Sequence, residues 1–504
     1  MKLSSMYNNK VVIIGGGLGG LLSGALLAKE GYAVTLVEKN HKIGGSLQSY
    51  RRFGEIFDTG MHVFGGMQKD GNIYRICKYL NILDDFKTID VDRDTCYKVF
   101  VAEENKLYEI GQGKTGFINS LSLYFPDEKL NIENYLSAIY RIMDESDLFY
   151  LRSSEHNLYD YSKDYSISAD QLSKKYLTNT KLQSLINSIN TLYAGEKGVT
   201  PSFLHAAILM IFLNGGCRII GGYQNFANAL GNCIKKHGGT ICTNDEVTRI
   251  RTSGKMVNAI ETHKGSIIEG DYFISAIPPI KMLDILDNKH VFTNAYQTFI
   301  KESEDSYSAF ILNVKLKDKM LPYLNHISFY LERYDSDWSV SDGTNVEKFM
   351  YMTPPTENQD FYARTFNVIA LMKWEAVERW AATSVGNRGD DYLNWKKQIS
   401  NIIISKLNKA IPGFDGMIAE MEAASPLTIR DYTTVRRGAM CGMKKKCDDM
   451  ISSFLPIKTR VKNLLLTGQS CNFHGFCGVS LTAIQTCEAI LGEHHLINKL
   501  SNVR

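Results

Sequence analysis

Three glycines near the start of the chain have a spacing that can hold a phosphate. Gly15, Gly17 and Gly20 form a GxGxxG pattern. Glycines at these positions permit a tight turn, the close approach of backbone N–H groups to a pyrophosphate, and close packing of the helix that follows. About 20 residues further on, Glu38 is placed to accept hydrogen bonds from a ribose. Together these residues predict a bound dinucleotide.

A second glycine-bearing segment, near the other end of the chain, is suited to an anion. A buried strand over residues 464–466 leads to Gly468, and the loop then reaches Gly475 and Gly478, where we expect a helix to begin at Val479. The first amides of a helix have no intrahelical partners and lie at the positive end of its dipole. The segment therefore predicts a place for a negatively charged part of a ligand.

Two histidines in glycine-rich segments are candidates for moving protons. His62 ends the sequence DTGMH and is the candidate catalytic residue, because the pKa of an imidazole can be tuned near neutrality. A structural role, in which His62 bonds to the backbone and shapes a pocket, stays open beside it. His474 is a weaker candidate for the same work. It lies within seven residues of Cys471 and Cys477, but the three do not have the spacing of a zinc site, so we expect no metal.

Hydrophobic patterning predicts the elements that position these residues. The strand before the first glycine, the helix after it and a second strand that ends at Glu38 form one βαβ unit. A second α/β segment begins at Gly221 and would return the chain to the same sheet. The expected strands are residues 11–14, 33–37, 240–242, 246–250, 257–262, 272–276, 308–315, 367–371 and 464–466, and the expected helices include 226–236, 392–411, 479–491 and a largely helical region over about 115–215.

One strongly apolar run, residues 203–213, needs its own interpretation. As a helix it would be ~17 Å long, whereas a bilayer core is ~30 Å thick, so it cannot span a membrane. We expect a buried core helix. A helix that dips into a membrane face or lines the mouth of an apolar tunnel remains the alternative.

Composition is that of an ordinary globular protein. The 504 residues are 44% apolar and 22% charged, and the net charge of +3 argues against a nucleic-acid partner. The ten cysteines include no CxxC pair, which predicts reduced thiols and a cytoplasmic location. A basic concentration over residues 430–462 belongs to a solvated face or, alternatively, to peripheral contact with the inner face of a membrane.

Several long stretches of the chain carry a family resemblance. The chain resembles the FAD-dependent oxidoreductases that include phytoene desaturases, carotenoid isomerase and retinol saturase. FDTGMH and TGQSCNFHGFCG, near the two ends, resemble retinol saturase and carotenoid isomerase more than amine oxidases. The resemblance covers nearly the whole chain and rests on residues 11–40, 43–66, 221–250, 273–279, 425–433 and 467–481.

This resemblance implies an α/β fold, in which a Rossmann-like, glutathione-reductase-type FAD-binding domain is interleaved with an α+β substrate domain. The FAD-binding domain would comprise residues 1–115, 216–295 and 421–504. A mainly helical substrate or lid region would cover residues 116–215, and a substrate domain with a β-sheet would cover residues 296–420.

The resemblance also implies a set of cofactor-binding residues. The first glycines would hold the pyrophosphate, Glu38 the adenosine ribose and Val247 the adenine, while Gly468 to Gly478 would contact the ribityl chain and the flavin ring, with His62 nearby. The full set is Gly15, Gly17, Leu18, Gly19, Gly20, Glu38, Lys39, Gly45, Ser46, Val247, Gly468, Gly475, Gly478 and Val479.

One position departs from the family pattern. Many relatives carry arginine directly after the glycine doublet at residues 44–45, where it balances phosphate charge, but here the residue is Ser46. Arg51 and Arg52 are the candidates to replace that charge.

The activity that the resemblance implies is redox chemistry on carbon–carbon bonds of an apolar polyene or isoprenoid: desaturation, saturation or isomerisation by hydride transfer at flavin N5. NAD(P)H or a quinone would be the electron partner, and Tyr432 is a candidate to face the substrate. The alternatives are a flavin amine oxidase, a protoporphyrinogen-type oxidase, and a non-catalytic FAD-binding protein associated with a membrane.

Overall fold

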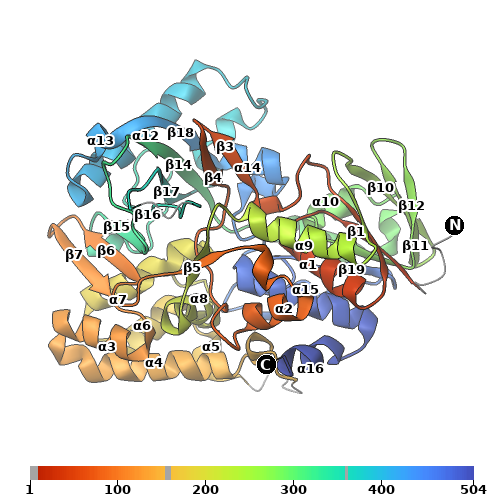
Figure 1. Cartoon of the computed structure of the whole chain (residues 1–504), viewed down its shortest axis with the longest axis horizontal. Helices are drawn as coiled ribbons and strands as arrows, with labels where there is room; N and C mark the ends of the chain where they lie inside the picture. Colours follow the sequence, from red (N-terminus) through yellow and green to blue (C-terminus); the bar gives the residue numbers. More distant parts are fainter. Residues whose placement is uncertain (1–8, 154–160, 358–360, 504) are drawn as a thin grey trace.

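A parallel sheet of five strands forms the first structural layer. The computed structural model describes residues 9–153, 161–357 and 361–503 (Figure 1). The strands run in the order β19-β13-β1-β2-β9, and every neighbouring pair is parallel. Their bounds are Lys10–Ile14 (β1), Ala33–Val37 (β2), Thr240–Cys242 (β9), Tyr272–Ser275 (β13) and Leu464–Leu466 (β19). The predicted return of the chain to this sheet after Gly221 is confirmed.

Both faces of this sheet are covered, as its nearly continuous apolar strands require. Val11 and Ile13 of β1 pack in one core with the helices α1 (Leu18–Lys29), α9 (Gln224–Lys236) and α15 (Gly475–Leu491). Val12 and Ile14 face a second core, which includes the antiparallel sheet of β10 (Val247–Ser253), β11 (Met256–Thr262) and β12 (Ile267–Glu269). The helix α15 begins at Gly475, four residues before the predicted start at Val479.

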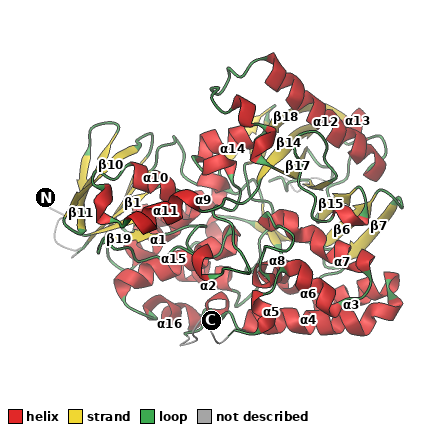
Figure 2. Ribbon diagram, turned by 180° about the vertical axis from the view of Figure 1, so that it is seen from behind, coloured by secondary structure: helices red, strands yellow, loops and turns green. Residues whose placement is uncertain are grey.

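A mixed sheet of seven strands forms the second part of the molecule, on the right in Figure 2. Its order is β18-β14-β17-β16-β15-β6-β7, with β15 and β6 parallel and the other pairs antiparallel. The bounds are Tyr97–Val101 (β6), Lys106–Ile110 (β7), Ser308–Leu316 (β14), Ile327–Leu331 (β15), Lys348–Met352 (β16), Thr365–Met372 (β17) and Ile418–Ala424 (β18). The strands β6 and β7 lie within residues 1–115, so the expected first FAD-binding part contributes two strands to this other sheet.

Helices cover the two faces of the seven-stranded sheet. On one face, α12 (Asp390–Ala410) and α13 (Phe414–Met417) pack against Phe310, Leu312 and Val314 of β14. On the other face, Ala309 and Ile311 join the core of a helical layer, seen at the lower left in Figure 1. That layer comprises α3 (Gly113–Tyr124), α4 (Lys129–Asp144), α5 (Lys163–Ser166), α6 (Ala169–Tyr176), α7 (Thr180–Asn187) and α8 (Ser202–Asn214).

The apolar run 203–213 forms α8 and is mostly buried within this layer, which confirms the expected core helix. Across the described part of the chain, no helix is both long enough and apolar enough to cross a membrane. The remaining elements are the hairpin β3 (Ser49–Arg52) and β4 (Glu55–Asp58), the pair β5 (Thr88–Asp90) and β8 (Cys217–Ile219), and the helices α2 (Asn72–Leu80), α10 (Pro279–Asp284), α11 (Asn294–Glu302), α14 (Pro426–Thr433) and α16 (His495–Ser501).

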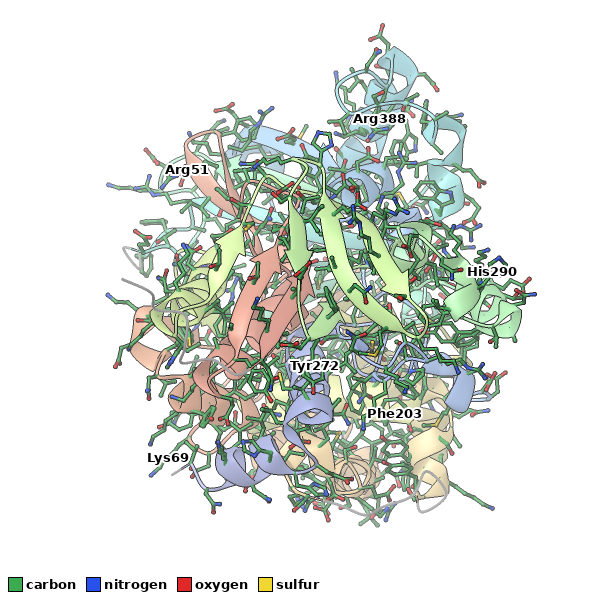
Figure 3. All side chains as sticks on the ribbon, turned by 90° about the vertical axis from the view of Figure 1, so that its right-hand side faces the viewer. Arg51, Lys69, Phe203, Tyr272, His290 and Arg388 are labelled. Atoms are coloured by element: carbon green, nitrogen blue, oxygen red, sulfur yellow. The ribbon has the colours of Figure 1, made fainter. Side chains whose placement is uncertain are left out.

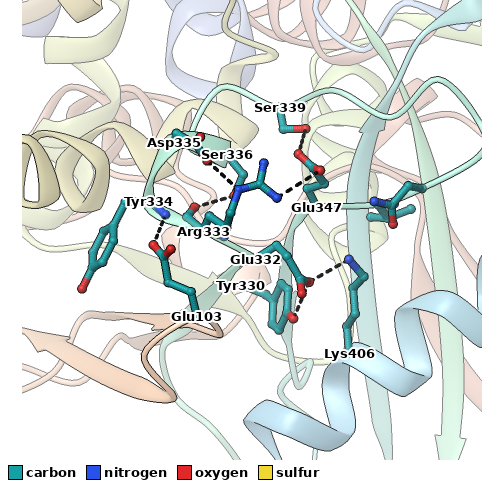
Figure 4. Close-up of polar contacts among 12 residues, drawn as sticks. Glu103, Tyr330, Glu332, Arg333, Tyr334, Asp335, Ser336, Ser339, Glu347 and Lys406 are labelled. Carbon is teal, nitrogen blue, oxygen red and sulfur yellow. Dashed lines mark hydrogen bonds and ion pairs between the residues drawn. The ribbon is translucent and has the colours of Figure 1, made fainter.

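A polar network fixes α12 to the end of β15 (Figure 4). The Lys406 ammonium of α12 donates to Glu332 Oε2 at 2.7 Å, and the Tyr330 hydroxyl donates to the same oxygen at 2.8 Å. Burial opposes ionisation of Glu332, but the hydrogen bonds from Lys406 and Tyr330 outweigh it and hold the pKa of Glu332 at about 2. The carboxylate therefore stays charged at neutral pH and anchors the helix.

Candidate functional site

A cavity of about 1110 Å³ lies where the two sheets meet. It is lined by the turn after β1, the segment that follows β2, the β3–β4 hairpin, the loop before α15, and parts of β14, β18, α12 and α14. Small-molecule pockets commonly enclose ~300–1,000 Å³. The cavity therefore has room for an elongated cofactor together with part of a second ligand.

The end of the cavity near β1 has the features of a dinucleotide cradle. Glu38 lines it, with Oε2 accepting from the Gly16 N–H at 2.7 Å and Oε1 accepting from the Asn40 N–H at 2.8 Å. Each carboxylate oxygen retains a lone pair for a ribose hydroxyl. Gly17 has no atom within 4 Å of where a Cβ would stand, so the turn leaves open space beside its backbone.

The loop before α15 closes the same cradle from the other end of the chain. Gly468 and Gly475 both have positive φ, at 105° and 74°, and neither has an atom within 4 Å of where a Cβ would stand. A Cβ on Gly19 would lie 3.2 Å from the backbone nitrogen of Gly468, so the two glycine segments lie side by side. Because α15 begins at Gly475, its unpaired first amides lie at the cavity wall.

Most of the residues in the predicted cofactor set line this cavity. Gly20 and Gly478 do not: a Cβ on Gly478 would lie 2.4 Å from the Cβ of Phe473, so this glycine permits the α15 helix to pack on its own loop. The contacts of each residue with the cofactor stay a prediction. Those that line the cavity are Gly15, Gly17, Leu18, Gly19, Glu38, Lys39, Gly45, Ser46, Val247, Gly468, Gly475 and Val479.

Arg51 and Arg52, the candidates to replace the charge missing at Ser46, do not line the cavity. Arg51 is exposed on the β3–β4 hairpin (Figure 3), and Arg52 pairs with Glu422 at 2.8 Å. Lys39 and Lys42 do line the cavity, directly after Glu38. Burial lowers the pKa of Lys39, an effect that a bound phosphate would reverse. Lysines from the segment after β2 are therefore better placed for this charge than Arg51 or Arg52.

His62 lies close behind the cavity wall, which Gly60 and Met61 form at this point. Its imidazole is buried, and Nε2 has no hydrogen-bond partner among the described residues. Burial, with the nearby positive charge of Arg218, lowers the pKa of His62 to about 3. The side chain is thus neutral at physiological pH, and its role in proton transfer stays a prediction.

Asp58, from the same DTGMH segment, does line the cavity. Its Oδ1 accepts from the Ser49 hydroxyl at 2.5 Å and from the Tyr223 N–H at 2.9 Å. Burial raises the pKa of Asp58 to about 6, against the opposing effect of these hydrogen bonds. The Tyr223 ring also packs against Phe476 in the first turn of α15. Sequence reasoning missed this carboxyl group, although the motif that contains it was recognised.

The cysteine and histidine cluster near α15 does not have the character of a reactive or metal-binding site. Burial raises the pKa of both Cys471 and Cys477 to about 12 and lowers that of His474 to about 3. Within residues 9–153, 161–357 and 361–503, no three His, Cys, Asp or Glu side chains gather as metal ligands would.

A second section of the cavity is largely apolar. Leu192 lies on the 3-10 helix Ser188–Tyr193, Ile311 on β14 and Ala424 on β18, and Ile429 and Met440 complete this wall. Tyr432, a candidate to face the substrate, lines the cavity at its rim and is 62% exposed. The apolar wall continues directly into the glycine-lined cradle.

Much of the basic concentration over residues 430–462 is neutralised within the molecule. Lys445 is buried, and its ammonium donates to the carbonyl oxygens of Ser453 and Ser470. Four further basic side chains of this region form ion pairs: Arg430–Asp431, Arg436–Asp305, Lys444–Glu196, Lys444–Glu304 and Lys446–Glu304.

Comparison with known proteins identifies the family. The sequence pattern of the flavin containing amine oxidoreductases matches residues 18–491, nearly the whole chain. The chain belongs to this family. FAD is therefore its cofactor, and the glycine cradle, the Glu38 carboxylate and the α15 amides fit such a dinucleotide. The chain is an FAD-dependent oxidoreductase with a Rossmann-type FAD-binding fold, as predicted.

Individual relatives cover most of the chain at low identity. Human all-trans-retinol 13,14-reductase is 25% identical over 98% of this chain and 87% of its own length. Prolycopene isomerase 2 from an Oncidium hybrid cultivar is 22% identical over 93% of this chain and 81% of its own. The crystal structure of an oxidoreductase from Methanosarcina mazei shares the fold, with a TM-score of 0.65 and 16% identity over 95% of this chain and 100% of the other.

Proposed function

We propose that the protein is an FAD-dependent oxidoreductase that acts on carbon–carbon bonds of an apolar polyene or isoprenoid, by desaturation, saturation or isomerisation. The observation that carries the proposal is the continuity of the apolar wall at Leu192, Ile311 and Met440 with the glycine-lined cofactor cradle. The names of the human and Oncidium relatives, a retinol reductase and a prolycopene isomerase, support this substrate class.

FAD, when bound, supplies hydride transfer at its N5 atom. The chain's own residues have three tasks. The amides at the start of α15 would hold the bound cofactor and would favour negative charge on the part of it that they face. The apolar wall excludes water from the substrate. Asp58 supplies or accepts the proton, because it lines the cavity and its pKa of about 6 allows both protonation states near neutral pH.

The test is a reaction between the purified holoenzyme and a polyene without oxygen. The flavin is reduced chemically, mixed with all-trans-retinol or a prolycopene-type carotenoid, and followed by its absorbance near 450 nm, with products identified by mass spectrometry. Reoxidation by a polyene, or a polyene isomer formed without net oxidation, supports the proposal. Oxidised enzyme that is bleached by an amine such as benzylamine, with no response to any polyene, indicates a flavin amine oxidase instead.

For the electron partner, we propose that NAD(P)H or a quinone exchanges electrons at the same flavin. The two are distinguished by rapid mixing: NADPH or NADH bleaches the oxidised holoenzyme, whereas a quinone restores the absorbance of the reduced one. The compound that reacts with the flavin faster than the enzyme turns over a polyene is the electron partner. If neither NAD(P)H nor a quinone reacts with the flavin, both classes are excluded as partners.

We also propose that the rim of the cavity contacts a membrane from which the substrate is drawn. Three apolar side chains that line the cavity are exposed at its rim: Val385 (57%), Leu393 (57%) and Tyr432 (62%). An apolar rim of this kind can lie in a lipid interface while the cavity opens toward the acyl chains. The ion pairs within residues 430–462 make that basic concentration a weaker basis for the same contact.

A further inference from the structure

The outer end of the cavity carries a cation that has no acidic partner. Lys396 on α12 lines the cavity and is partly buried. Across the described residues, its ammonium has no carboxylate at ion-pair distance, since Glu422, whose charge acts on it, pairs with Arg52 at 2.8 Å instead. Burial removes water from the ammonium and lowers the pKa of Lys396. A bound anion would stabilise the charged ammonium in place of the water that burial has removed.

The position of Lys396 is defined by an aromatic ring. Its Nζ lies 5.7 Å from the ring centroid of Tyr392, and the Arg388 guanidinium lies 5.4 Å from the same centroid. Arg388 forms an ion pair with Asp431. Of the two cations beside this ring, Lys396 is the one left for a ligand.

A neutral hydrogen-bonding pair lines the same cavity, and the charge of Glu422 acts on its tyrosine as it does on Lys396. The Asn313 side-chain amide donates to the Tyr50 hydroxyl oxygen at 2.7 Å, and both residues line the cavity. Asn313 is itself oriented by a hydrogen bond from Asn367. Burial and the charge of Glu422 raise the pKa of Tyr50 to about 12, so the phenol keeps its proton and can donate it to an acceptor in the cavity.

From this polar end, the wall becomes apolar toward the cofactor. Asn313 pairs with Glu422 across β14 and β18, and two residues along the same face Ile311 pairs with Ala424. The strand reaches Ser308 ~16 Å from Asn313, at about 3.3 Å per residue. There the Ser308 hydroxyl donates to the carbonyl oxygen of Gly438, and the segment that follows contacts Gln469 in the loop before α15.

We propose that this mouth binds the carboxylate of an amphipathic lipid, which enters tail first and places its unsaturated chain along the apolar wall. Lys396 binds the carboxylate, and Tyr50 donates a hydrogen bond to it. The distance from head group to flavin then sets which double bond reacts. The inference rests on the proposed function and narrows its substrate from apolar polyenes in general to those with an acidic end. A pyridine nucleotide fits less well, because its polar ribose would lie against Ile311 and Ala424.

The test compares three ligands that share one polyene chain and differ in the head group: all-trans-retinoate, its methyl ester and all-trans-retinol. Each is titrated into FAD-loaded enzyme, and the perturbation of the flavin spectrum gives the Kd. The variant is Lys396→Met, and the matched control is Lys397→Met, which removes a neighbouring exposed charge that does not line the cavity. Binding of NADPH is measured in the same variants.

We expect wild-type enzyme to bind retinoate more tightly than the ester, and Lys396→Met to weaken retinoate binding about 10-fold or more, as loss of a charge-assisted hydrogen bond does. Retinol affinity should change less than 2-fold, and Lys397→Met should leave all three ligands unchanged. Equal affinity for acid and ester, or equal effects of the two variants, overturns the inference. The inference is also overturned if Lys396→Met weakens the binding of NADPH alone and leaves retinoate binding unchanged. If no polyene binds or reacts, the proposed function fails too; if retinol reacts in every variant without head-group dependence, only the inference fails.

Discussion

A Cβ on Gly20 would lie 2.1 Å from the carbonyl oxygen of Gly15, whereas a Cβ on Gly17 would meet no atom within 4 Å. The same motif therefore contains two kinds of glycine. Gly20 permits α1 to pack closely on the end of β1. Gly17 has ordinary extended backbone, with φ of −74°, and leaves space for a ligand rather than for the protein.

This difference predicts opposite effects for two alanine substitutions. Gly17→Ala should fold with an unchanged Tm in the apo form and lose most of its bound FAD, because the new methyl group occupies the cofactor's space. Gly20→Ala should cost about 3 kcal/mol of stability, the upper range for overpacking a well-packed site. Flavin absorbance per protein chain and the Tm of apo and holo forms measure both. A Gly17→Ala protein that retains full FAD occupancy contradicts the interpretation of the cradle.

Local sequence patterns were sufficient to predict the bounds of several strands. Residues 33–37 and 240–242 form strands with the predicted bounds, because each is a short apolar run between turn residues. The sequence predicts the start of α15 four residues late, at Val479, because Gly475 and Gly478 lower helix propensity. In the structure, Gly478 lets the first turn of the helix pack closely on Phe473 of its own loop, whereas Gly475 begins the helix with a positive φ and open space beside it.

The parts that could not be predicted depend on contacts between distant segments. The partnership of β6 with β15 joins residues more than two hundred positions apart, and no local pattern specifies it. The pKa of Asp58 depends on its burial, which raises it, and on the hydrogen bond from the backbone N–H of Tyr223, which lies 165 positions away and lowers it. Lys396 carries no functional signal in the sequence, because a lysine on an amphipathic helix is usually solvated; only the tertiary structure shows that it lines a cavity.

Asp58 should give the reaction a pH dependence. Proton donation needs the protonated carboxyl, so in single-turnover oxidation of reduced enzyme by a polyene, the rate should fall as pH rises through about 6. Asp58→Asn keeps an acceptor for Ser49 and Tyr223 but cannot supply a proton, and it should slow this step ~100-fold or more and remove the pH dependence.

His62→Asn is the comparison for Asp58→Asn. If His62 only shapes the pocket, this variant keeps the pH profile. A pH profile abolished in His62→Asn and retained in Asp58→Asn would assign the proton to His62.

The stability of the protein gives a separate readout for Asp58. Because folding raises the pKa of Asp58 from 3.8 to about 6, the free energy of unfolding should fall by roughly 3 kcal/mol as pH rises between those values. Asp58→Asn should remove that slope.

The exposed apolar rim should determine membrane contact. Replacing Val385, Leu393 and Tyr432 with serine removes apolar surface at the mouth of the cavity and should abolish most co-sedimentation with liposomes. The matched control is Leu123→Ser with Leu130→Ser, since these leucines are 83% and 67% exposed and do not line the cavity. Equal loss in both variants would show that binding follows general surface hydrophobicity and not the rim.

The anchoring of α12 by Glu332 should matter for ligand binding as well as for stability, because the same helix carries Lys396. Lys406→Met removes the half-buried donor to Glu332 and should lower the free energy of unfolding by about 1 kcal/mol. Lys409→Met removes a more exposed donor, 3.1 Å from the other oxygen of the same carboxylate, and should cost less. With its donors present, Glu332 has a pKa of about 2, so its contribution to stability is complete above pH 4.5 and is lost as pH falls toward 2.

If α12 positions Lys396, then Lys406→Met should weaken retinoate binding more than Lys409→Met does, while leaving retinol affinity unchanged. Thermal unfolding across pH 2–7, together with ligand titration, measures both effects; identical behaviour of the two variants would show that Glu332 does not position the helix.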